Sequence, residues 1–266
     1  MSQPLIPPHG RHVDLREYDP AFTGHVSKEQ ARERLPALRA RLNELQDTLY
    51  ADRRFAVLVV LQGIDTAGKD GTIKSVFQDV GPLGCSVANF GVPTDVELAH
   101  DFLWRYHRDT PEKGKFVVFN RSHYEAVLVE RVKGLVPETT WRARYDQINA
   151  FERFLAGENV VIMKFFLHIS RDEQRERLQE RVDNPKKHWK FRHGDLEERR
   201  NWDQYQLAFA DMLSHCNPAH APWHVVPADH TWYRDAVIAQ ALVDRLEALG
   251  LRYPGPFEHL AGIRVE

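Results

Sequence analysis

Short apolar runs recur along the chain, and longer segments with apolar residues at every third or fourth position lie between them. A short apolar run bounded by polar or glycine-rich residues is typical of a buried β-strand. Strands that alternate with helices favour a parallel sheet covered on both faces, so the pattern predicts an α/β fold. The expected strands are Phe55–Leu61, Ser86–Phe90, Phe116–Asn120, Asn159–Ile169 and Trp223–Pro227.

The segments between these runs have helical periodicity. The helix expected from Ser27 to Tyr50 has one leucine stripe, and the arginines on its other sides indicate a solvated face or, alternatively, a basic wall along a polyanion. Two further helices are expected to begin at capping boxes, Thr94–Glu97 and Ser122–Glu125. With these two, the helices expected after the first lie at about 69–80, 94–108, 122–133, 138–156, 171–182 and 232–249.

Two segments do not follow this alternation. Residues 1–26 are aperiodic and contain several prolines, which indicates an arm lying on the body. Residues 184–200 are strongly basic and poor in apolar side chains, which indicates a loop or lid. No linker divides the rest, so 27–266 is expected to be a single domain with its lid at about 184–200.

Composition excludes few classes of protein. Charged residues make up 28% of the 266 residues and the formal net charge is -2, so a polyanion partner would need a local basic patch. Cys85 and Cys216 lie far apart, as expected for inert thiols in a reducing cytoplasm. Since no apolar stretch reaches membrane-spanning length and the N-terminus lacks a signal-peptide pattern, we expect a cytoplasmic protein without a membrane partner.

A glycine-spaced loop follows the first expected strand. Residues 63–71 read GIDTAGKDG and satisfy the spacing G-x-x-x-x-G-K of a phosphate-binding loop, in which backbone N–H groups and a lysine surround an anion. The alternative is a glycine-rich turn with a surface lysine, which the flanking strand and helix patterns disfavour. The loop predicts a catalytic Lys69 and phosphate contacts from Gly63, Thr66, Ala67, Gly68, Asp70, Gly71 and Lys74.

Two acidic residues distinguish this loop from that of an ordinary ATPase. Asp70 stands where serine or threonine usually follows the lysine, and Asp65 lies inside the loop. Carboxylates in an anion site repel the ligand unless a cation lies between them. The loop therefore predicts phosphate together with Mg²⁺, with Asp65 as a metal ligand.

The third expected strand ends in polar residues. Asn120 occupies the place where P-loop enzymes usually carry a metal-binding acid, and an amide oxygen also suits Mg²⁺. Arg121 can contact a transferring phosphate, whereas the alternative for both residues is a strand-end cap with a surface ion pair. Glu125 is explained by the capping box, and a role with Arg121 in binding the nucleotide acceptor is equally open.

A basic run follows the helix expected at 171–182. We interpret it as a lid that closes over phosphates, in preference to a solvated loop; a nucleic-acid patch fits less well because the chain is slightly acidic. A zinc site among His215, His220, His224 and His230 is disfavoured because no metal-binding spacing occurs. The lid residues expected to bind phosphate are Arg181, Lys186, Lys187, Lys190 and Arg192.

Together the loop, the strand end FNRSHYE and the lid run NPKKHWKF resemble the polyphosphate kinase 2 family over about residues 30–250. Asn120 with His123 and Glu125 resembles its class III branch, which phosphorylates nucleoside mono- and diphosphates. The resemblance implies a thymidylate-kinase-like P-loop fold, a polyphosphate donor, AMP, ADP and ATP as nucleotides, and a homo-oligomer that is tetrameric. By motif position it implies that Asp65, Lys69, Asn120 and Arg121 are the most important residues.

A phosphate acceptor is already ionised at neutral pH, so its phosphorylation requires positioning and charge neutralisation but no general base. The expected function is reversible, Mg²⁺-dependent transfer of the terminal phosphate of polyphosphate to AMP or ADP. The alternatives are an ATP-dependent nucleoside monophosphate kinase, which Asp65 and Asp70 disfavour, and a non-catalytic polyanion-binding protein.

Overall fold

A parallel sheet of five strands forms the centre of the structure, a computed structural model that describes residues 5–256 and 264–265. The strand order is β2-β3-β1-β4-β5, and all neighbouring strands are parallel. This architecture confirms the α/β prediction. The strands are β1 (Ala56–Gln62), β2 (Cys85–Asn89), β3 (Phe116–Asn120), β4 (Val160–His168) and β5 (Trp223–Pro227).

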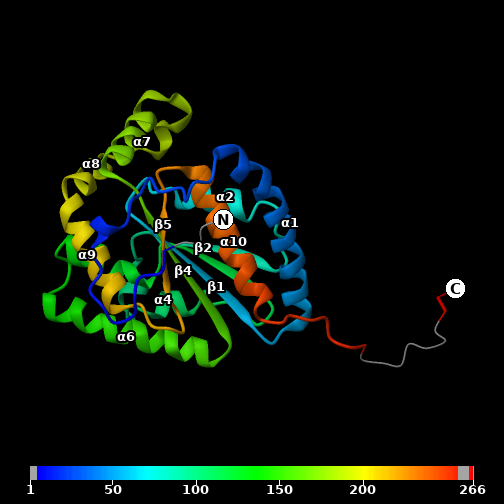
Figure 1. Cartoon of the computed structure of the whole chain (residues 1–266). Helices are drawn as coiled ribbons and strands as arrows, with labels where there is room; N and C mark the ends of the chain where they lie inside the picture. The colour runs from blue at the N-terminus through cyan, green and yellow to red at the C-terminus, as the bar shows by residue number, and fades with distance from the viewer. Residues whose placement is uncertain (1–4, 257–263, 266) are drawn as a thin grey trace.

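Helices cover both faces of the sheet (Figure 1). α1 (Lys28–Asp52), α2 (Lys69–Val76) and α10 (Thr231–Glu247) lie on one side, and α6 (Glu138–Gly157) and α9 (Trp202–His215) on the other. The remaining helices are α3 (Asp95–Leu98), α4 (Trp104–His107), α5 (Val129–Val132), α7 (Arg171–Asp183) and α8 (His193–Arg200), with 3₁₀ turns η1 (Leu15–Glu17), η2 (His123–Ala126) and η3 (Pro185–Lys190).

The two central strands are buried along their whole length. Every residue of β1 and β4 is buried, which explains why these strands read as continuous apolar runs and do not alternate. Because Leu61 of β1 is in register with Asn120 of β3, the loops that follow these two strands begin side by side at the carboxyl edge of the sheet. Ligands of open parallel sheets bind at this edge.

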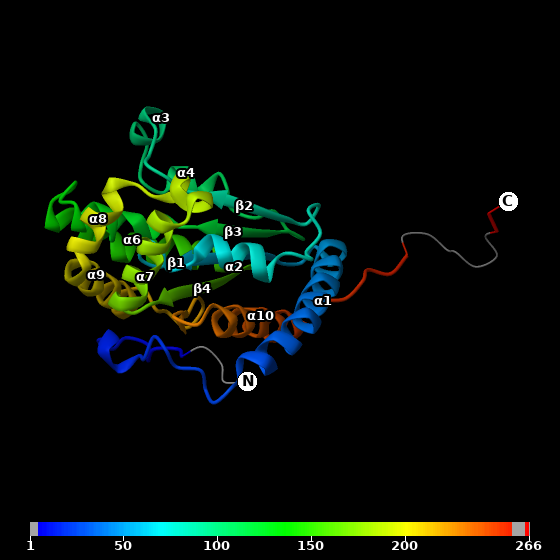
Figure 2. The ribbon, with the colours of Figure 1, turned by 90° about the horizontal axis from the view of Figure 1, so that it is seen from above.

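Several predicted elements differ from the observed ones. The helix expected at 94–108 is divided into α3 and α4, and Figure 2 shows α3 extending away from the body. The capping box at Thr94–Glu97 is confirmed. The helix expected at 122–133 is η2 followed by α5, and α2 ends at Val76 instead of residue 80. The sequence analysis did not identify α9.

The segment 184–200 is helical, so the expectation of a loop is wrong. It contains η3 and α8, which continue from α7; Figure 1 shows α7 and the turn after it projecting beyond the rest of the molecule. Pro185 begins η3, where its missing N–H costs nothing, and Asn184 caps the turn by accepting a hydrogen bond from Lys186 N.

The N-terminal segment lies along the body. Leu5 pairs with Val225 of β5 as an antiparallel bridge, and Asn217 Nδ2 donates to the carbonyl of Pro7. Residues 1–4 of the expected arm, and 257–263 and 266 of the expected domain, lie outside the described residues. In the ranges described, no helix has both the length and the apolar content needed to cross a bilayer.

Candidate active site

The loop between β1 and α2 is built for close packing. A Cβ at Gly63 would come 2.8 Å from Ala67 Cβ and 2.9 Å from the carbonyl oxygen of Leu167, so only glycine fits there. Thr66 and Gly68 have positive φ angles of 68° and 102°. The chain thereby turns sharply out of β1 and enters α2 at Lys69.

Two arginines from distant helices hold the outer side of this loop. Arg177 Nη1 donates to the carbonyls of Thr66 (3.0 Å) and Ala67 (3.1 Å), and Arg234 Nη1 donates to Ala67 O at 3.4 Å. Since the C=O and N–H of a peptide unit point in opposite directions, the N–H of Gly68 is turned away from these arginines. Sequence reasoning missed both residues, because α7 and α10 meet the loop only through the tertiary fold.

Lys69 lies inside the loop. Its ammonium group donates to Gly63 O at 2.7 Å and to Ile64 O at 3.3 Å, and its side chain is buried. Burial lowers the pKa of Lys69 and Arg121 lowers it further, whereas the negative charges of Asp65 and Glu125 act in the opposite direction. The lysine is therefore held at the centre of the loop by carbonyl groups that an anion can replace.

Asp65 is connected through Arg181 of α7 to the basic segment, residues 184–200. Its carboxylate accepts a hydrogen bond from Arg181 Nη1 at 2.8 Å, and the same nitrogen lies 3.0 Å from a carboxylate oxygen of Asp195. Burial raises the pKa of Asp65, but Lys69 and Arg181 more than compensate, so its pKa is below the ordinary value. Arg181 of α7 thus connects the loop to α8.

The loop and the basic segment together enclose a cleft of about 210 Å³. Six predicted residues of the loop and three predicted lysine or arginine residues line it, and Arg177 and Glu180 line it in addition. Lys74, Lys186 and Arg192 are exposed and are not among its lining residues. The predicted lining residues are Asp65, Thr66, Gly68, Lys69, Asp70, Gly71, Arg181, Lys187 and Lys190.

The end of β3 lies beside the loop. Asn120 Nδ2 donates to Asp70 Oδ1 and to Asn89 Oδ1, both at 2.8 Å, so the two predicted polar residues Asn120 and Asp70 are in contact. Among residues 5–256 and 264–265, no three histidine, cysteine or acidic side chains form a group that could hold a metal ion. Mg²⁺ in phosphate sites needs only one or two protein oxygens, because phosphate and water supply the rest. The carboxylates of Asp65 and Asp70 and the amide of Asn120 fit such a site.

Arg121 and Glu125 face each other after β3. Arg121 Nη1 lies 3.3 Å from Glu125 Oε2, and Gln62 Nε2 donates to Glu125 Oε1 at 3.1 Å. Since Ser122 Oγ accepts from Tyr124 N and the carboxylate of Glu125 is engaged elsewhere, the predicted capping box at Ser122–Glu125 is wrong. The negative charge of Glu125 raises the pKa of Arg121, against the effect of burial.

Sequence reasoning also missed an acidic residue of α8. Burial raises the pKa of Glu198, and the nearby charge of Asp65 raises it further, whereas Arg121, Lys133 and Lys69 lower it. Its carboxylate lies 3.8 Å from Lys133 Nζ. The segment 184–200 therefore carries acidic as well as basic side chains.

Comparison with known proteins agrees with this geometry. The family model described as Polyphosphate kinase 2 (PPK2) matches residues 25–252. The chain is 53% identical to an AMP/ADP-polyphosphate phosphotransferase of Meiothermus ruber, over 96% of each chain. It is 42% identical to an ADP-polyphosphate phosphotransferase of Rhodopseudomonas palustris, over 92% of this chain and 89% of the relative.

A solved structure is similar throughout. Polyphosphate kinase 2 from Arthrobacter aurescens TC1 superimposes with a TM-score of 0.91 at 40% identity, covering 94% of this chain and 90% of the other. The resemblance seen in the loop, the strand end and the basic segment thus extends over nearly the whole sequence. The chain belongs to the polyphosphate kinase 2 family.

Proposed function

We propose that the chain transfers the terminal phosphate of inorganic polyphosphate to AMP or ADP in a reversible, Mg²⁺-dependent reaction. The family relatives named as AMP/ADP- and ADP-polyphosphate phosphotransferases support the reaction class. Both substrates end in a phosphate, and both products contain a phosphoanhydride bond. The step therefore has little intrinsic preference for one direction.

The lining of the cleft is the observation that favours polyphosphate over ATP as the phosphate donor. The described residues that line it are charged residues, one threonine and two glycines, and none of them has an aliphatic or aromatic side chain. A phosphate chain needs cations and N–H donors, whereas a purine base needs an apolar or aromatic contact. Arg177, Lys187 and Lys190 extend the positive lining beyond the loop itself, which suits a long polyanion.

The transfer itself requires positioning and charge neutralisation. An oxygen of the acceptor phosphate attacks the terminal phosphorus of polyphosphate, the bond to the next bridging oxygen breaks, and the shortened chain leaves as an anion. Lys69 and the N–H groups at the start of α2 would hold the terminal donor phosphate. Arg121 and Glu125 would bind the acceptor nucleotide, and Arg121 would also stabilise charge on the phosphoryl group during transfer.

Mg²⁺, when bound, would neutralise phosphate charge and orient phosphate oxygens. The loop offers Asp65 for this purpose, together with the Asp70–Asn120 pair. Arg181, which pairs with Asp65 and lines the same cleft, would contact the donor phosphates.

The experiment that tests the function supplies purified protein with Mg²⁺, long-chain polyphosphate and either AMP or ADP, and follows ADP and ATP formation. We expect phosphorylated nucleotide with polyphosphate as the donor, and polyphosphate formation from ATP in the reverse assay. An ATP-dependent nucleoside monophosphate kinase would give product with ATP and none with polyphosphate. A binding protein without catalytic activity would give no product with either donor.

A further inference from the structure

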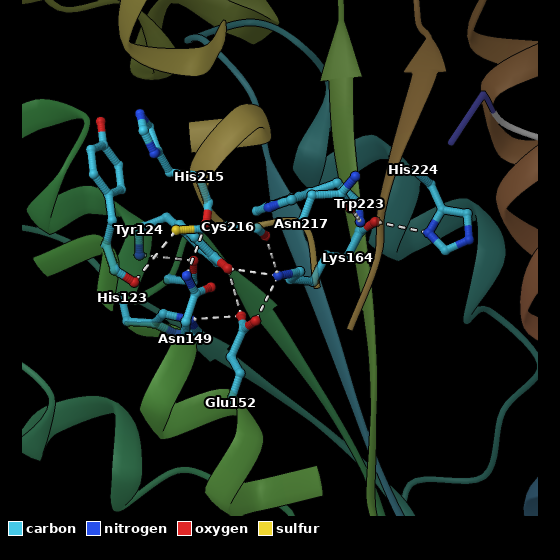
Figure 3. Close-up of polar contacts among 12 residues, drawn as sticks. His123, Tyr124, Asn149, Glu152, Lys164, His215, Cys216, Asn217, Trp223 and His224 are labelled. Carbon is cyan, nitrogen blue, oxygen red and sulfur yellow. Dashed lines mark hydrogen bonds and ion pairs between the residues drawn. The ribbon is translucent and has the colours of Figure 1, made fainter. Parts of the chain in front are cut away.

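A buried polar network lies behind the segment that carries Arg121 and Glu125, and neither the loop nor the cleft includes it. Figure 3 shows its centre, the ion pair between Lys164 of β4 and Glu152 of α6. Both side chains are 0% exposed, and their charged atoms are 2.6 Å apart. A charged pair buried between the sheet and a helix requires an explanation, since a protein with apolar residues of similar volume in its place is often equally stable.

Every charged atom of the pair has partners. Lys164 Nζ donates to Glu152 Oε2 at 2.6 Å, to Tyr124 Oη at 2.7 Å and to the carbonyl of Cys216 at 2.9 Å. Glu152 Oε1 accepts from Tyr124 Oη at 2.7 Å and lies 3.1 Å from His123 Nε2. The lysine thus uses all three of its protons, whereas the second ring nitrogen of His123, Nδ1, is buried without a hydrogen-bond partner.

The network fixes the residues between Arg121 and Glu125. His123 and Tyr124 point into the core and bind the ion pair, whereas Arg121 and Glu125 on either side of them point toward each other and the site. Arg121 has a left-handed backbone with φ of 64°, which a non-glycine residue adopts only when its surroundings hold it there. The anchoring of His123 and Tyr124 supplies such a constraint.

The ion pair also contacts the end of α9, through Lys164. The carbonyl of Cys216 is at the end of α9, the helix that follows α8 and the basic segment. Lys164 is also in register with Val60 of β1, three residues before the phosphate loop begins at Gly63. Its ammonium group therefore joins the turn after β3, helix α6 and the end of α9 at one point beneath the carboxyl edge of the sheet.

We propose that Glu152 and Lys164 are positioning residues for the acceptor side of the site, acting through His123 and Tyr124 on Arg121 and Glu125. The inference rests on the proposed function, in which Arg121 and Glu125 bind the acceptor nucleotide. It predicts that substitutions in the network raise the KM for AMP and ADP far more than the KM for polyphosphate.

The first test uses Tyr124→Phe, which removes one hydroxyl that contacts both charges and keeps the ring. Ile148→Val is the matched control, because Ile148 is a fully buried residue of the same helix as Glu152 and has no part in the network. We expect Tyr124→Phe to lower kcat/KM for AMP and ADP by about ten-fold or more, mostly through KM, with the KM for polyphosphate within about two-fold of wild type. Ile148→Val should leave both KM values unchanged.

A second variant and a second measurement keep the test decisive. Glu152→Leu combined with Lys164→Met removes both charges together and leaves no unpaired ion, so it is expected to fold. Hydrogen–deuterium exchange of the peptide spanning 118–127 should be faster in Tyr124→Phe and in the double variant, but not in Ile148→Val. This measurement needs no turnover, so it still tests the inference if wild-type protein fails to phosphorylate a nucleotide.

Any of three results would overturn the inference. One is unchanged exchange of the 118–127 peptide in both network variants. The second is an equal rise in the KM values of acceptor and donor, and the third is a fall in kcat alone that follows the loss of stability. If the proposed function itself is wrong, the wild-type protein will not phosphorylate AMP or ADP with polyphosphate, which is a separate and recognisable result.

Discussion

The charged side chains of this site already have partners within the protein. The carbonyls of Gly63 and Ile64 bind Lys69, and Arg181 binds Asp65. Each of these contacts occupies a group that a phosphate or a cation would also bind. A site of this kind stabilises a phosphoryl transfer by fixed charges that are already oriented.

Lys69→Ala tests the central cation. We expect loss of transfer by about 10²–10³-fold, because a buried charge beside the transferring group is removed while the loop backbone is retained. Turnover with polyphosphate and ADP gives the effect, and circular dichroism checks the fold. Activity near that of the wild type would show that the lysine does not contact the donor.

Asp65→Ala tests the metal ligand. The variant should respond much less to Mg²⁺, and Arg181 should keep Asp195 as its partner, so α8 stays attached to α7. The measurement is a titration of Mg²⁺ against the initial rate. A titration curve identical to that of the wild type would remove Asp65 from the metal site.

At the scale of elements, the phosphate loop is held between α7, α10 and the basic segment. Arg177 and Arg234 fix its carbonyls, and Arg181 connects it to α8 through Asp195. The basic segment is thus joined to the loop by two ion pairs that share Arg181, and all three side chains are largely buried. Asp195 therefore attaches this segment beside the cleft.

Asp195→Asn tests this connection. We expect the KM for polyphosphate to rise by about three- to ten-fold, since a charge-assisted hydrogen bond of roughly 1.5 kcal/mol or less is weakened. The KM for AMP and ADP should stay the same. Asp203→Asn, at an exposed position at the start of α9, is the control and should behave as wild type. If Asp195→Asn leaves the KM for polyphosphate unchanged, the attachment of α8 to Arg181 does not contribute to donor binding.

The strands and the phosphate loop were predictable because their signals are local. A buried strand, a glycine spacing and a following helix lie within about 25 residues of each other. The break between α3 and α4 was not predicted, although Asp101 was a local signal for it: its carboxylate accepts a hydrogen bond from Leu103 N just before α4 begins. The apolar residues of α9 do repeat at helical spacing, so that signal was available in the sequence: Trp202, Tyr205, Ala208, Phe209, Met212 and Leu213.

The candidate site was only partly predictable for a different reason. Residues within the motifs, such as Lys69 and Asp65, were found from their spacing. Arg177 and Arg234 carry no motif, and they reach the site because distant helices pack against the loop. The buried pair of Lys164 and Glu152 has a weak sequence signal, a lysine in the middle of an apolar strand.

For the whole molecule, buried histidines couple stability to pH. Burial lowers the pKa of His123, His168 and His224 from the usual value of 6.5. The folded state therefore binds fewer protons than the unfolded state just below pH 6.5, so the free energy of unfolding decreases as the pH falls through this range.

Each of the three histidines contributes up to about 1.4 kcal/mol per pH unit in that window. Glu198, whose pKa burial raises, acts in the opposite direction but is one group against three. Urea unfolding at pH 7.5, 6.5 and 5.5 should show little change above pH 7 and a marked loss below pH 6.5. Constant or rising stability down to pH 5.5 would contradict the neutral, buried state of these histidines.

The oligomeric state implied by the family resemblance stays a prediction, which mass determination by light scattering would test. The exposed apolar residues Val92, Val96 and Leu98 lie on or beside α3, the helix that extends from the body in Figure 2. The function proposed here uses residues of one chain alone, so it does not depend on the outcome.

The most direct test of the central claim is a crystal structure of the chain with polyphosphate and Mg²⁺. We expect the terminal phosphate to lie against Lys69 and the start of α2, the rest of the polyphosphate to run toward Lys187 and Lys190, and a cation to lie at Asp65. Polyphosphate bound elsewhere, with the loop of residues 63–69 unchanged and without ligand, would contradict it.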